Sequence, residues 1–496
     1  MTAASVAPAY SGISSGIPGL DEILCGGLSP ERLYLIEGLP GTGKTTLALK
    51  FLLEGVKQGE SVLYITLSET KSELEAVAKS HGWSLEGIHI HEVIPSEDLL
   101  DPAQQHTLFH PSEVELGDTT RDISSVVEKF KPSRIVIDSL SELRLLASNA
   151  LRYRRQVLAY KQFFARRNCT VLMLDDRPDM HDMQIRSIAH GVIALEQVQQ
   201  EYGSEKRHLR VIKLRGVQFR GGAHDYVIEK GGLVVFPRLI PSTTRAQSKT
   251  MRQLSSGLDR LDSLLGGGLE EGTSTIISGA PGTGKSSLAA QFVSAAIARG
   301  QNAAMFIFEE AATLLVNRTK SINIDLLTPL EKGNLIIQQI DPAEMSPGQF
   351  THRVCSAVEK NETKIVVIDS LNGYMNAMPN EHYLAVHLHE LLTYLGQKGV
   401  ITILVGVHSG MIGNIMSSAG ETSYLADNVI LIRHFEFHGE VRQAISVFKK
   451  RAGSHERTIR EFTITGQGIR VGNSLRDFHG VLTGVPTFEG KQLDEA

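Results

Sequence analysis

The sequence predicts an α/β protein built from two tandem domains, each a mostly parallel sheet flanked by helices. Three observations support this prediction. A stretch that begins at residue 14 recurs without a gap at residue 255. In both copies an apolar, strand-like run leads through a glycine-rich loop into a helix-like run. Each half also has a second, continuous apolar run, which is typical of a buried parallel strand. Strands that alternate with helices favour a sheet covered on both faces.

The repeat defines the domain organisation. The first copy reads SSGIPGLDEILCGGLSPERLYLIEGLPGTGKTTLALKF (14–51), and the second reads SSGLDRLDSLLGGGLEEGTSTIISGAPGTGKSSLAAQF (255–292). The spacing between the copies is that of a whole α/β domain and is far too long for a solenoid repeat. We therefore predict a first domain over residues 1–240, a polar linker over 241–253, a second domain over 254–480 and a short tail over 481–496.

The composition excludes several classes of protein. Of the 496 residues, 42% are hydrophobic and 21% are charged, which excludes a disordered chain. No apolar run reaches the roughly 18 residues of a membrane-spanning helix, and the N-terminus lacks the segments of a signal peptide. The net charge of -5 argues against a protein that coats nucleic acid. The three cysteines are widely spaced and form no metal-ligand cluster, which favours a reduced, cytoplasmic setting.

Both glycine-rich loops match the pattern G-x-x-x-x-G-K-[ST]. Glycines let successive backbone N–H groups surround a phosphate, and the following helix directs its positive end at the same anion. The lysine adds a charge for the outer phosphates, and the next hydroxyl is a ligand for Mg²⁺. Two matches at equivalent positions argue against a mere glycine-rich turn. The predicted phosphate-binding residues are Gly38, Gly41, Thr42, Gly43, Lys44, Thr45 and Thr46 in the first copy, and Gly279, Gly282, Thr283, Gly284, Lys285, Ser286 and Ser287 in the second.

A second apolar run ends in an aspartate in each half. These aspartates are Asp138, after RIVI, and Asp369, after KIVVI. The carboxyl end of a parallel strand faces the nucleotide site in folds of this kind, so each aspartate can hold a metal ion together with the loop hydroxyl. We predict Mg²⁺ sites at Thr45 with Asp138 and at Ser286 with Asp369. The alternative is that each aspartate caps the following helix.

The two halves differ at the end of the next strand. Glu309 and Glu310 stand in the second half where Ser68 and Glu69 stand in the first. A carboxylate there can orient or deprotonate an attacking water or hydroxyl. We predict that Glu309, Glu310 and Glu69 are catalytic and that the second domain is the more active one. The alternative is that these residues are solvated at a strand end.

A basic pair follows a late strand in each half. The pairs are Lys213 with Arg215, and Lys449 with Arg451. Residues two apart on a strand point the same way. They are either a solvated basic edge or a cation pair that reaches the nucleotide of a neighbouring subunit.

At this point the chain resembles the KaiC family of circadian-clock ATPases, which have tandem RecA-like P-loop domains. The segments FIFEEA, DPAEMSPGQF, VVIDSLNGY, SYLADNVILIRHFE and VFKKRAGSHERTIREF carry the resemblance, together with the duplication. It covers about residues 12 to 486. The resemblance implies a homohexameric double ring with ATP and Mg²⁺ between subunits, and an unidentified signalling partner. It also implies trans contacts to ATP from Lys213, Arg215, Lys449, Arg451 and His455.

The resemblance further implies serine/threonine autophosphorylation in the second domain. The matching stretch is ETSYLAD, in which Ser423 matches the family serine and Tyr424 replaces the threonine. Ser423, with Thr422 as a substitute, is therefore the predicted phosphoacceptor; the alternative is a helix cap or turn. Two further departures, Ser68 for a glutamate and Phe219 for a histidine, favour a KaiC-like homologue over a clock pacemaker.

Two other functions compete with this one. A nucleic-acid-dependent ATPase of the wider RecA class would share both nucleotide motifs, but it needs a basic groove that the charge balance does not favour. A non-catalytic signalling scaffold would use ATP to hold the assembly together. We expect an ATPase with autokinase activity that acts in signalling or clock-type regulation.

Overall fold

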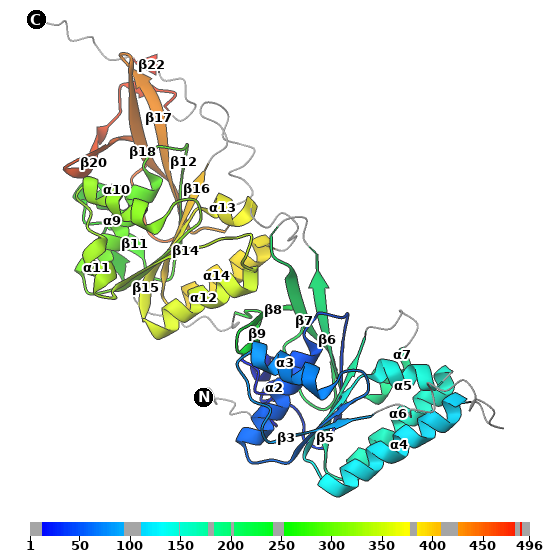
Figure 1. Ribbon diagram of the computed structural model, residues 1–496. Coiled ribbons are helices and arrows are strands. Elements are labelled where there is room, and N and C mark those ends of the chain that lie inside the picture. The colour runs from blue at the N-terminus through cyan, green and yellow to red at the C-terminus, as the bar shows by residue number, and fades with distance from the viewer. Residues whose placement is uncertain are drawn as a thin grey trace, which may run out of the picture. The chain divides into compact units, whose positions relative to one another are not determined.

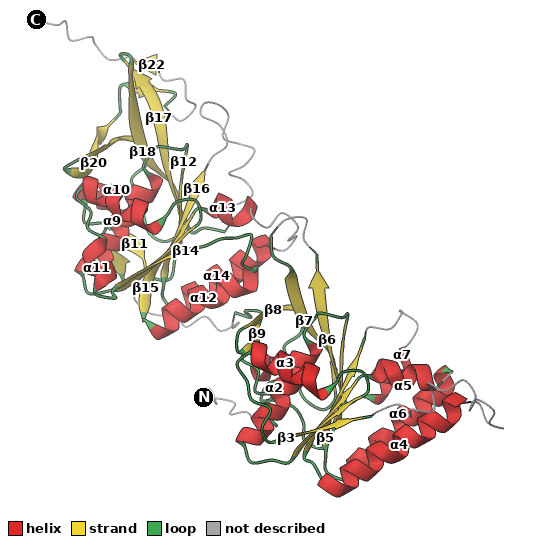
Figure 2. Cartoon of the chain, in the orientation of Figure 1, coloured by secondary structure: helices red, strands yellow, loops and turns green. Residues whose placement is uncertain are grey.

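The computed structural model divides the chain into two compact units, with the boundary in the sequence after Arg238 (Figure 1). The described residues are 12–93, 111–147, 149–176, 183–199, 203–241, 252–376, 384–407, 425–481 and 487–488. Both units are α/β, with a mostly parallel sheet flanked by helices (Figure 2). The predicted fold class is confirmed.

The first unit has a nine-stranded sheet in the order β3-β2-β4-β5-β1-β6-β7-β8-β9. The strands are β1 (Leu33–Gly38), β2 (Val62–Thr66), β3 (Ile88–Glu92), β4 (Arg134–Asp138), β5 (Thr170–Asp175), β6 (Gly191–Val198), β7 (Lys206–Leu214), β8 (His224–Glu229) and β9 (Gly232–Phe236). β1 to β6 pair in parallel, and β7 to β9 continue the sheet antiparallel. The helices are α1 (Leu20–Ile23), α2 (Lys44–Lys57), α3 (Lys71–Ser80), α4 (Pro111–Phe130), α5 (Leu140–Leu146), α6 (Ala150–Ala165) and α7 (Met183–Ile188).

The second unit repeats this order as β14-β13-β15-β16-β12-β17-β18-β19-β20. Its strands are β12 (Ser274–Gly279), β13 (Asn302–Ile307), β14 (Leu335–Gln339), β15 (Thr363–Asp369), β16 (Ile401–Val407), β17 (Asn428–Phe437), β18 (Glu440–Lys450), β19 (Arg460–Thr465) and β20 (Gly468–Ser474). Short strand pairs are β10 (Gln253–Leu254) with β11 (Leu269–Glu270), and β21 (Phe478–His479) with β22 (Thr487–Phe488). The helices are α8 (Asp259–Leu264), α9 (Lys285–Ala298), α10 (Ala312–Ser321), α11 (Leu327–Glu331), α12 (Pro347–Lys360), α13 (Leu371–Asn376) and α14 (Leu384–Gln397).

The core of each unit lies on both faces of its sheet. In the first unit α1 to α3 cover one face, and α4 to α7 cover the other. The central strands are therefore buried from end to end; every residue of β1 and of β12 is buried. This burial explains why both strands read as unbroken apolar runs and not as alternating ones. In the described part of the chain, no helix has the length and apolar composition that a bilayer crossing requires.

One buried charge distinguishes the first unit. Arg134 opens β4 with a side chain that is 0% exposed, and its Nε donates to Glu60 Oε2 at 2.6 Å. Its Nη1 donates to the carbonyl oxygens of Ser14, at 2.8 Å, and Phe51, at 3.0 Å. The guanidinium also lies 4.8 Å from the centre of the Phe51 ring. It therefore joins the N-terminal segment, α2 and β4. Ile365 stands at the matching place in β15, as the pairing registers of the two sheets show.

We expect Arg134→Ala to destabilise the first unit by about 3–5 kcal/mol, because it removes the buried donor of Glu60 and of the Ser14 and Phe51 carbonyls. Urea unfolding followed by the fluorescence of Trp83, the single tryptophan, reports on this unit. Arg121→Ala is the control, since that side chain is 79% exposed. A loss below about 1 kcal/mol, the level of a surface ion pair, would contradict the structural role of Arg134.

Candidate functional site

Each glycine-rich loop joins the central strand of its sheet to the helix that follows. Gly43 has a φ of 88° and Gly284 a φ of 90°, in the left-handed region that favours glycine. A Cβ at these glycines would lie 2.6 Å from Ile228 Cδ1 and 2.3 Å from Ile464 Cδ1, respectively. Glycine is therefore required both for its backbone conformation and for the space around it.

The loop lysines turn back over their own loops. Lys44 Nζ donates to the carbonyl oxygens of Gly38, at 2.7 Å, and Leu39, at 3.1 Å. Lys285 Nζ donates to Ala280 O at 2.8 Å. Neither α2 nor α9 has a side-chain cap in the described structure, so the first N–H groups of both helices remain available. An ammonium group and free N–H groups at the start of a helix together suit a phosphate.

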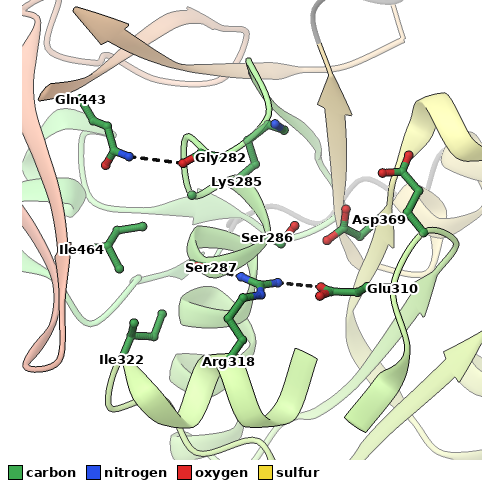
Figure 3. Close-up of a pocket in the computed structure, with 12 residues that line it drawn as sticks. Gly282, Lys285, Ser286, Ser287, Glu310, Arg318, Ile322, Asp369, Gln443 and Ile464 are labelled. Atoms are coloured by element: carbon green, nitrogen blue, oxygen red, sulfur yellow. Dashed lines mark hydrogen bonds and ion pairs between the residues drawn. The ribbon is translucent and has the colours of Figure 1, made fainter. Parts of the chain in front are cut away.

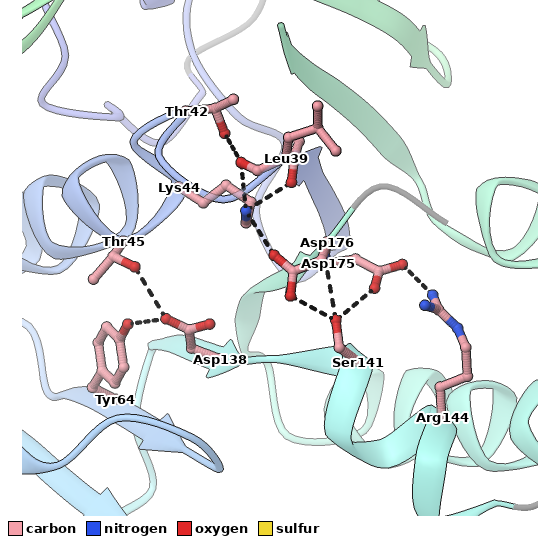
Figure 4. A network of polar contacts seen from close by, with 11 residues as sticks. Leu39, Thr42, Lys44, Thr45, Tyr64, Asp138, Ser141, Arg144, Asp175 and Asp176 are labelled. Atoms are coloured by element: carbon pink, nitrogen blue, oxygen red, sulfur yellow. Dashed lines mark hydrogen bonds and ion pairs between the residues drawn. The ribbon is translucent and has the colours of Figure 1, made fainter. Parts of the chain in front are cut away.

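The strand-end aspartates lie beside these loops. Asp138 Oδ2 accepts hydrogen bonds from Thr45 Oγ1, at 3.3 Å, and from Tyr64 Oη, at 2.6 Å (Figure 4). In the second unit Ser286 and Asp369 line the same cavity, and the nearby Ser286 hydroxyl opposes the rise in the pKa of Asp369. The structure thus brings together each predicted hydroxyl and carboxylate from different elements. Hard oxygen donors of this kind are what Mg²⁺ prefers, so both pairs fit the ion.

The two aspartates differ in their surroundings. Burial raises the pKa of Asp369 to about 6, and the carboxylates of Glu310 and Glu309 add to the increase. Its Oδ2 atom is buried and has no hydrogen-bond partner among the described residues. Burial also raises the pKa of Asp138, but the hydrogen bonds from Tyr64 and Thr45 oppose the increase. A buried carboxylate oxygen with no donor is an arrangement that a bound cation would satisfy.

The two glutamates of the second unit have different partners. Glu310 accepts from Arg318 Nη2 at 2.6 Å, and Arg318 Nη1 donates to Ser287 Oγ at 2.9 Å (Figure 3). Glu309 instead accepts from the hydroxyl of Ser370, the residue after Asp369. Arg318 was not identified from the sequence. It ties Glu310 to the first turn of α9, which leaves Glu309 as the carboxylate that can act on a reactant.

These groups line a cavity of about 620 Å³ in the second unit (Figure 3). Lys285, Ser286, Asp369 and the two glutamates form its polar side. Ile322 and Ile464 also line it, and Gln443 Nε2 donates to Gly282 O across it at 3.4 Å. A pocket of this size, with apolar walls and a few convergent polar groups, suits a small ligand.

In the first unit the corresponding carboxylates are arranged differently. Ser68 stands in place of Glu309, and Val77 stands in place of Arg318. Glu69 Oε2 is buried and makes no hydrogen bond among the described residues. Burial raises the pKa of Glu69, and Asp138 and Glu73 add to the increase. This unit therefore has neither the arginine tether nor the first carboxylate of the pair.

Asp176, which the sequence analysis did not single out, contacts the loop lysine of the first unit. Its Oδ1 lies 2.9 Å from Lys44 Nζ, and its Oδ2 accepts from Ser141 Oγ at 3.0 Å (Figure 4). Next to it, Asp175 is paired with Arg144 at 2.6 Å. By the strand registers Asp176 corresponds to Val407. The signal in the sequence was the pair of acids after the apolar run VLML, which becomes informative only once β5 is known to lie beside β1.

The basic pairs lie toward the amino ends of the parallel strands, away from the glycine-rich loops. Lys213 pairs with Val192, which pairs with Leu35, three residues before Gly38 on β1. Lys213 Nζ donates to Arg186 O at 2.6 Å, and Arg215 Nη2 donates to Ser187 O at 2.7 Å. Neither of these contacts is to the unit's own phosphate loop.

The second unit shows the same placement. Lys449 Nζ donates to Ala426 O at 2.8 Å, and Arg451 Nη1 to Asp427 Oδ1 at 3.3 Å. Lys450, between them, points inward to Glu270 at 2.7 Å. His455 lies in the connection between β18 and β19 and is partly buried. The predicted phosphoacceptors, Thr422 and Ser423, lie outside the described residues, as does Tyr424.

Comparisons with known proteins agree on one family. The family model described as "ATPase: KaiC" matches twice, over residues 13–240 and 254–476. The "Circadian clock protein KaiC3" of Synechocystis sp. is 25% identical over 96% of this chain and 94% of that protein. The "Circadian clock oscillator protein KaiC" of Synechococcus elongatus is 28% identical over 95% of this chain and 91% of that protein. The KaiC of Parathermosynechococcus lividus is 27% identical, with 95% and 87% covered.

The raised pKa of Asp369 predicts a pH-dependent effect on stability. An ordinary aspartate titrates near 3.9, and this one near 6 in the folded state. The stability that the protonated group contributes is present below about pH 4 and is lost as pH rises through about 6. In protein free of nucleotide and treated with EDTA, Asp369→Asn should therefore raise the melting temperature of the second unit at pH 7.5. The gain corresponds to at most about 3 kcal/mol and shrinks toward pH 5.

Differential scanning calorimetry at several pH values checks this. Glu331→Gln is the control, since Glu331 is exposed on α11. A variant that melts below the wild type at pH 7.5 would show that ionised Asp369 is satisfied by its surroundings, against the prediction.

Proposed function

The chain belongs to the KaiC family of ATPases, and from this we propose that it binds ATP with Mg²⁺ at both loops and hydrolyses it mainly in the second domain. The observation that carries the proposal is that the two glutamates of the second domain have different partners. Glu310 is held by Arg318 at 2.6 Å, while Glu309 projects into the same cavity without an arginine partner in the described structure.

The geometry of this cavity supports phosphoryl transfer. The N–H groups at the start of α9 and the ammonium of Lys285 bind and orient the phosphates. Ser286 and Asp369 would hold Mg²⁺, which supplies charge neutralisation at the phosphate oxygens. Glu309 accepts the proton of the attacking water or hydroxyl. Ile322 and Ile464 provide apolar surface for the base of the nucleotide.

We propose that the first domain holds ATP with slow turnover. Ser68 has no carboxylate to accept a proton from water, and Asp176 competes with phosphate for Lys44. Tyr64 and Thr45 hold Asp138 in place as a metal ligand. A domain of this kind suits ATP that holds an assembly together. This feature supports the scaffold interpretation for the first domain.

We propose further that ATP lies between subunits of a self-assembled ring, a homohexamer with two tiers. The positions of the basic pairs support this. Lys213 and Lys449 are level with a residue of the central strand that lies three residues, or roughly 10 Å, before the loop. Their side chains donate hydrogen bonds toward the amino ends of the parallel strands. If Lys213, Arg215, Lys449, Arg451 and His455 contact a nucleotide, it is therefore that of another subunit. Head-to-tail contacts of this sort generate rings or filaments.

The most specific part of the proposal is a serine/threonine autokinase activity that acts in signalling or clock-type regulation. The names of the relatives and the position of Ser423 four residues before Asp427 support it. Thr422 is the substitute acceptor. A protein partner then reads the phosphorylated state or the assembled ring.

Glu309→Gln should lower ATP turnover by about 100-fold or more, because it removes the proton acceptor. Phosphate release by the purified full-length protein with Mg-ATP measures this. Glu69→Gln is the matched variant, and its effect on total turnover should be small. Turnover that survives in Glu309→Gln and disappears in Glu69→Gln would place the main site in the first domain instead.

The same incubation tests the kinase. Intact-mass spectrometry and peptide mapping should find one phosphate on Ser423 or Thr422, absent from Glu309→Gln and from the doubly substituted Thr422→Ala/Ser423→Ala chain. If ATP is consumed and no phosphate appears, the autokinase part of the proposal is rejected and the ATPase part stands.

Asp176→Asn should strengthen ATP binding by the first domain by about 5- to 10-fold, or roughly 1 kcal/mol, because it frees Lys44 and removes a negative charge beside the phosphates. Titration with a fluorescent ATP analogue measures this in a Lys285→Ala background, which suppresses the second site. Asp118→Asn, on the exposed face of α4, is the control. Weaker binding would mean that Asp176 helps to hold the nucleotide.

A further inference from the structure

One edge of the first domain's sheet, where the parallel strands begin, has a cluster of basic side chains. Arg32 directly precedes β1, Lys161 lies on α6 and His190 directly precedes β6. These three residues line a cavity of about 210 Å³, together with Phe164 and Cys169. The Arg215 N–H donates to His190 O at 3.1 Å, which places Arg215 beside the cavity. We call Arg32, Lys161, His190, Lys213 and Arg215 the basic edge.

The basic edge is not neutralised by carboxylates within the described structure. Its side chains donate hydrogen bonds to carbonyl oxygens: Lys161 Nζ to Ile188 at 2.7 Å, Lys213 Nζ to Ala189 at 2.8 Å, and Arg215 Nη2 to Ser187 at 2.7 Å. Glu31 also lines the cavity, and Arg32 Nη1 donates to its backbone carbonyl at 3.1 Å. His190 Nε2 is buried and has no hydrogen-bond partner there. Several cations at close range repel one another unless an anion is present.

The pKa values of His190 and Lys161 reflect how close the basic groups lie to one another. Burial lowers the pKa of His190, and Arg32, Arg215 and Lys161 lower it further. Burial likewise lowers the pKa of Lys161, with Arg215 and Arg32 contributing. Each group is therefore within electrostatic reach of the others, and a bound anion would relieve the repulsion.

The second domain lacks this charge at the same place. By the strand registers His190 corresponds to Asp427, and Arg32 corresponds to Thr273. Asp427 accepts from Arg451 Nη1 at 3.3 Å and from the Ser274 N–H at 3.0 Å. The basic pair of the second domain is thus balanced by a carboxylate of its own chain. The first domain has an imidazole at that position.

We propose that the basic edge is an anion site for the phosphate groups of a nucleotide, with Arg32, Lys161 and His190 as ligands in addition to Lys213 and Arg215. The phosphates come from the nucleotide of a neighbouring copy's first domain, which rests on the assembly proposed above, or from a free phosphate compound. In either case the cavity admits a phosphate group, and Lys161 and Arg32 supply the charge that binds it.

The first test measures the site without the phosphate loops or the ring. In a full-length Lys44→Ala/Lys285→Ala chain, calorimetric titration with inorganic pyrophosphate should show one remaining site per chain if free phosphate compounds bind. Adding Arg32→Gln and Lys161→Gln should weaken that binding at least 10-fold, whereas adding Lys79→Gln, an exposed lysine on α3, should not. His190→Asp, which introduces the second domain's residue, is the alternative variant if the glutamine pair does not fold.

The second test keeps both loops intact and measures assembly with ATP by native mass spectrometry at increasing salt. If the phosphates belong to a neighbouring copy, Arg32→Gln/Lys161→Gln should disassemble at lower salt than the wild type, and Lys79→Gln should match the wild type. A positive result in either test supports the site, and negative results in both overturn it. If the wild-type chain does not assemble with ATP, the proposed ring fails, while the pyrophosphate titration still decides the anion site.

Discussion

Both sites depend on the position of a single strand in each sheet. β1 and β12 lie at the centre, each with a parallel strand on either side, so the ends of these strands meet at one edge. This parallel pairing brings Thr45 to within 3.3 Å of Asp138, although 93 residues separate them in the chain. The left-handed conformation of Gly43 and Gly284 then turns the chain from strand to helix within hydrogen-bonding distance of that edge. Without this arrangement the aspartate would be far from the lysine and the hydroxyl, which are neighbours in the sequence.

The duplication preserved this frame and changed the charges around it. In the second domain Arg318 neutralises one glutamate and leaves the other directed at the cavity. In the first domain the acidic groups have other partners: Asp176 forms an ion pair with Lys44, and Asp138 accepts a hydrogen bond from Tyr64. Glu309 accepts a hydrogen bond from the Ser370 hydroxyl and has no arginine partner in the described structure. The difference between the domains therefore lies in which carboxylates are present and in their partners, while the strand order is the same.

Much of this was predictable from the sequence, and the remainder was not, for a physical reason. The fold class and the family follow from features that are local or repeated, such as the loop at Gly38 and its copy at Gly279. The residues that were missed, Tyr64, Asp176 and Arg318, act across the sheet or between a helix and a loop. Their roles depend on which strands are neighbours, and β5 precedes β6 in the chain while β1 lies between them in space. Single-sequence reasoning does not give that order.

The proposed assembly uses the two ends of each sheet for opposite halves of one interaction. The phosphate loop lies at the carboxyl ends of the parallel strands. The basic pair lies toward their amino ends, where its hydrogen bonds include backbone carbonyls and, in the second domain, Asp427. A surface that presents cations at one end and binds phosphates at the other is complementary to itself when copies stack head to tail. The first domain has uncompensated cations at its basic edge within the described structure, and it has Ser68 where the second domain has Glu309. Since binding energy that is equal in substrate and transition state holds a ligand without accelerating its reaction, this combination suits retention of ATP over its turnover.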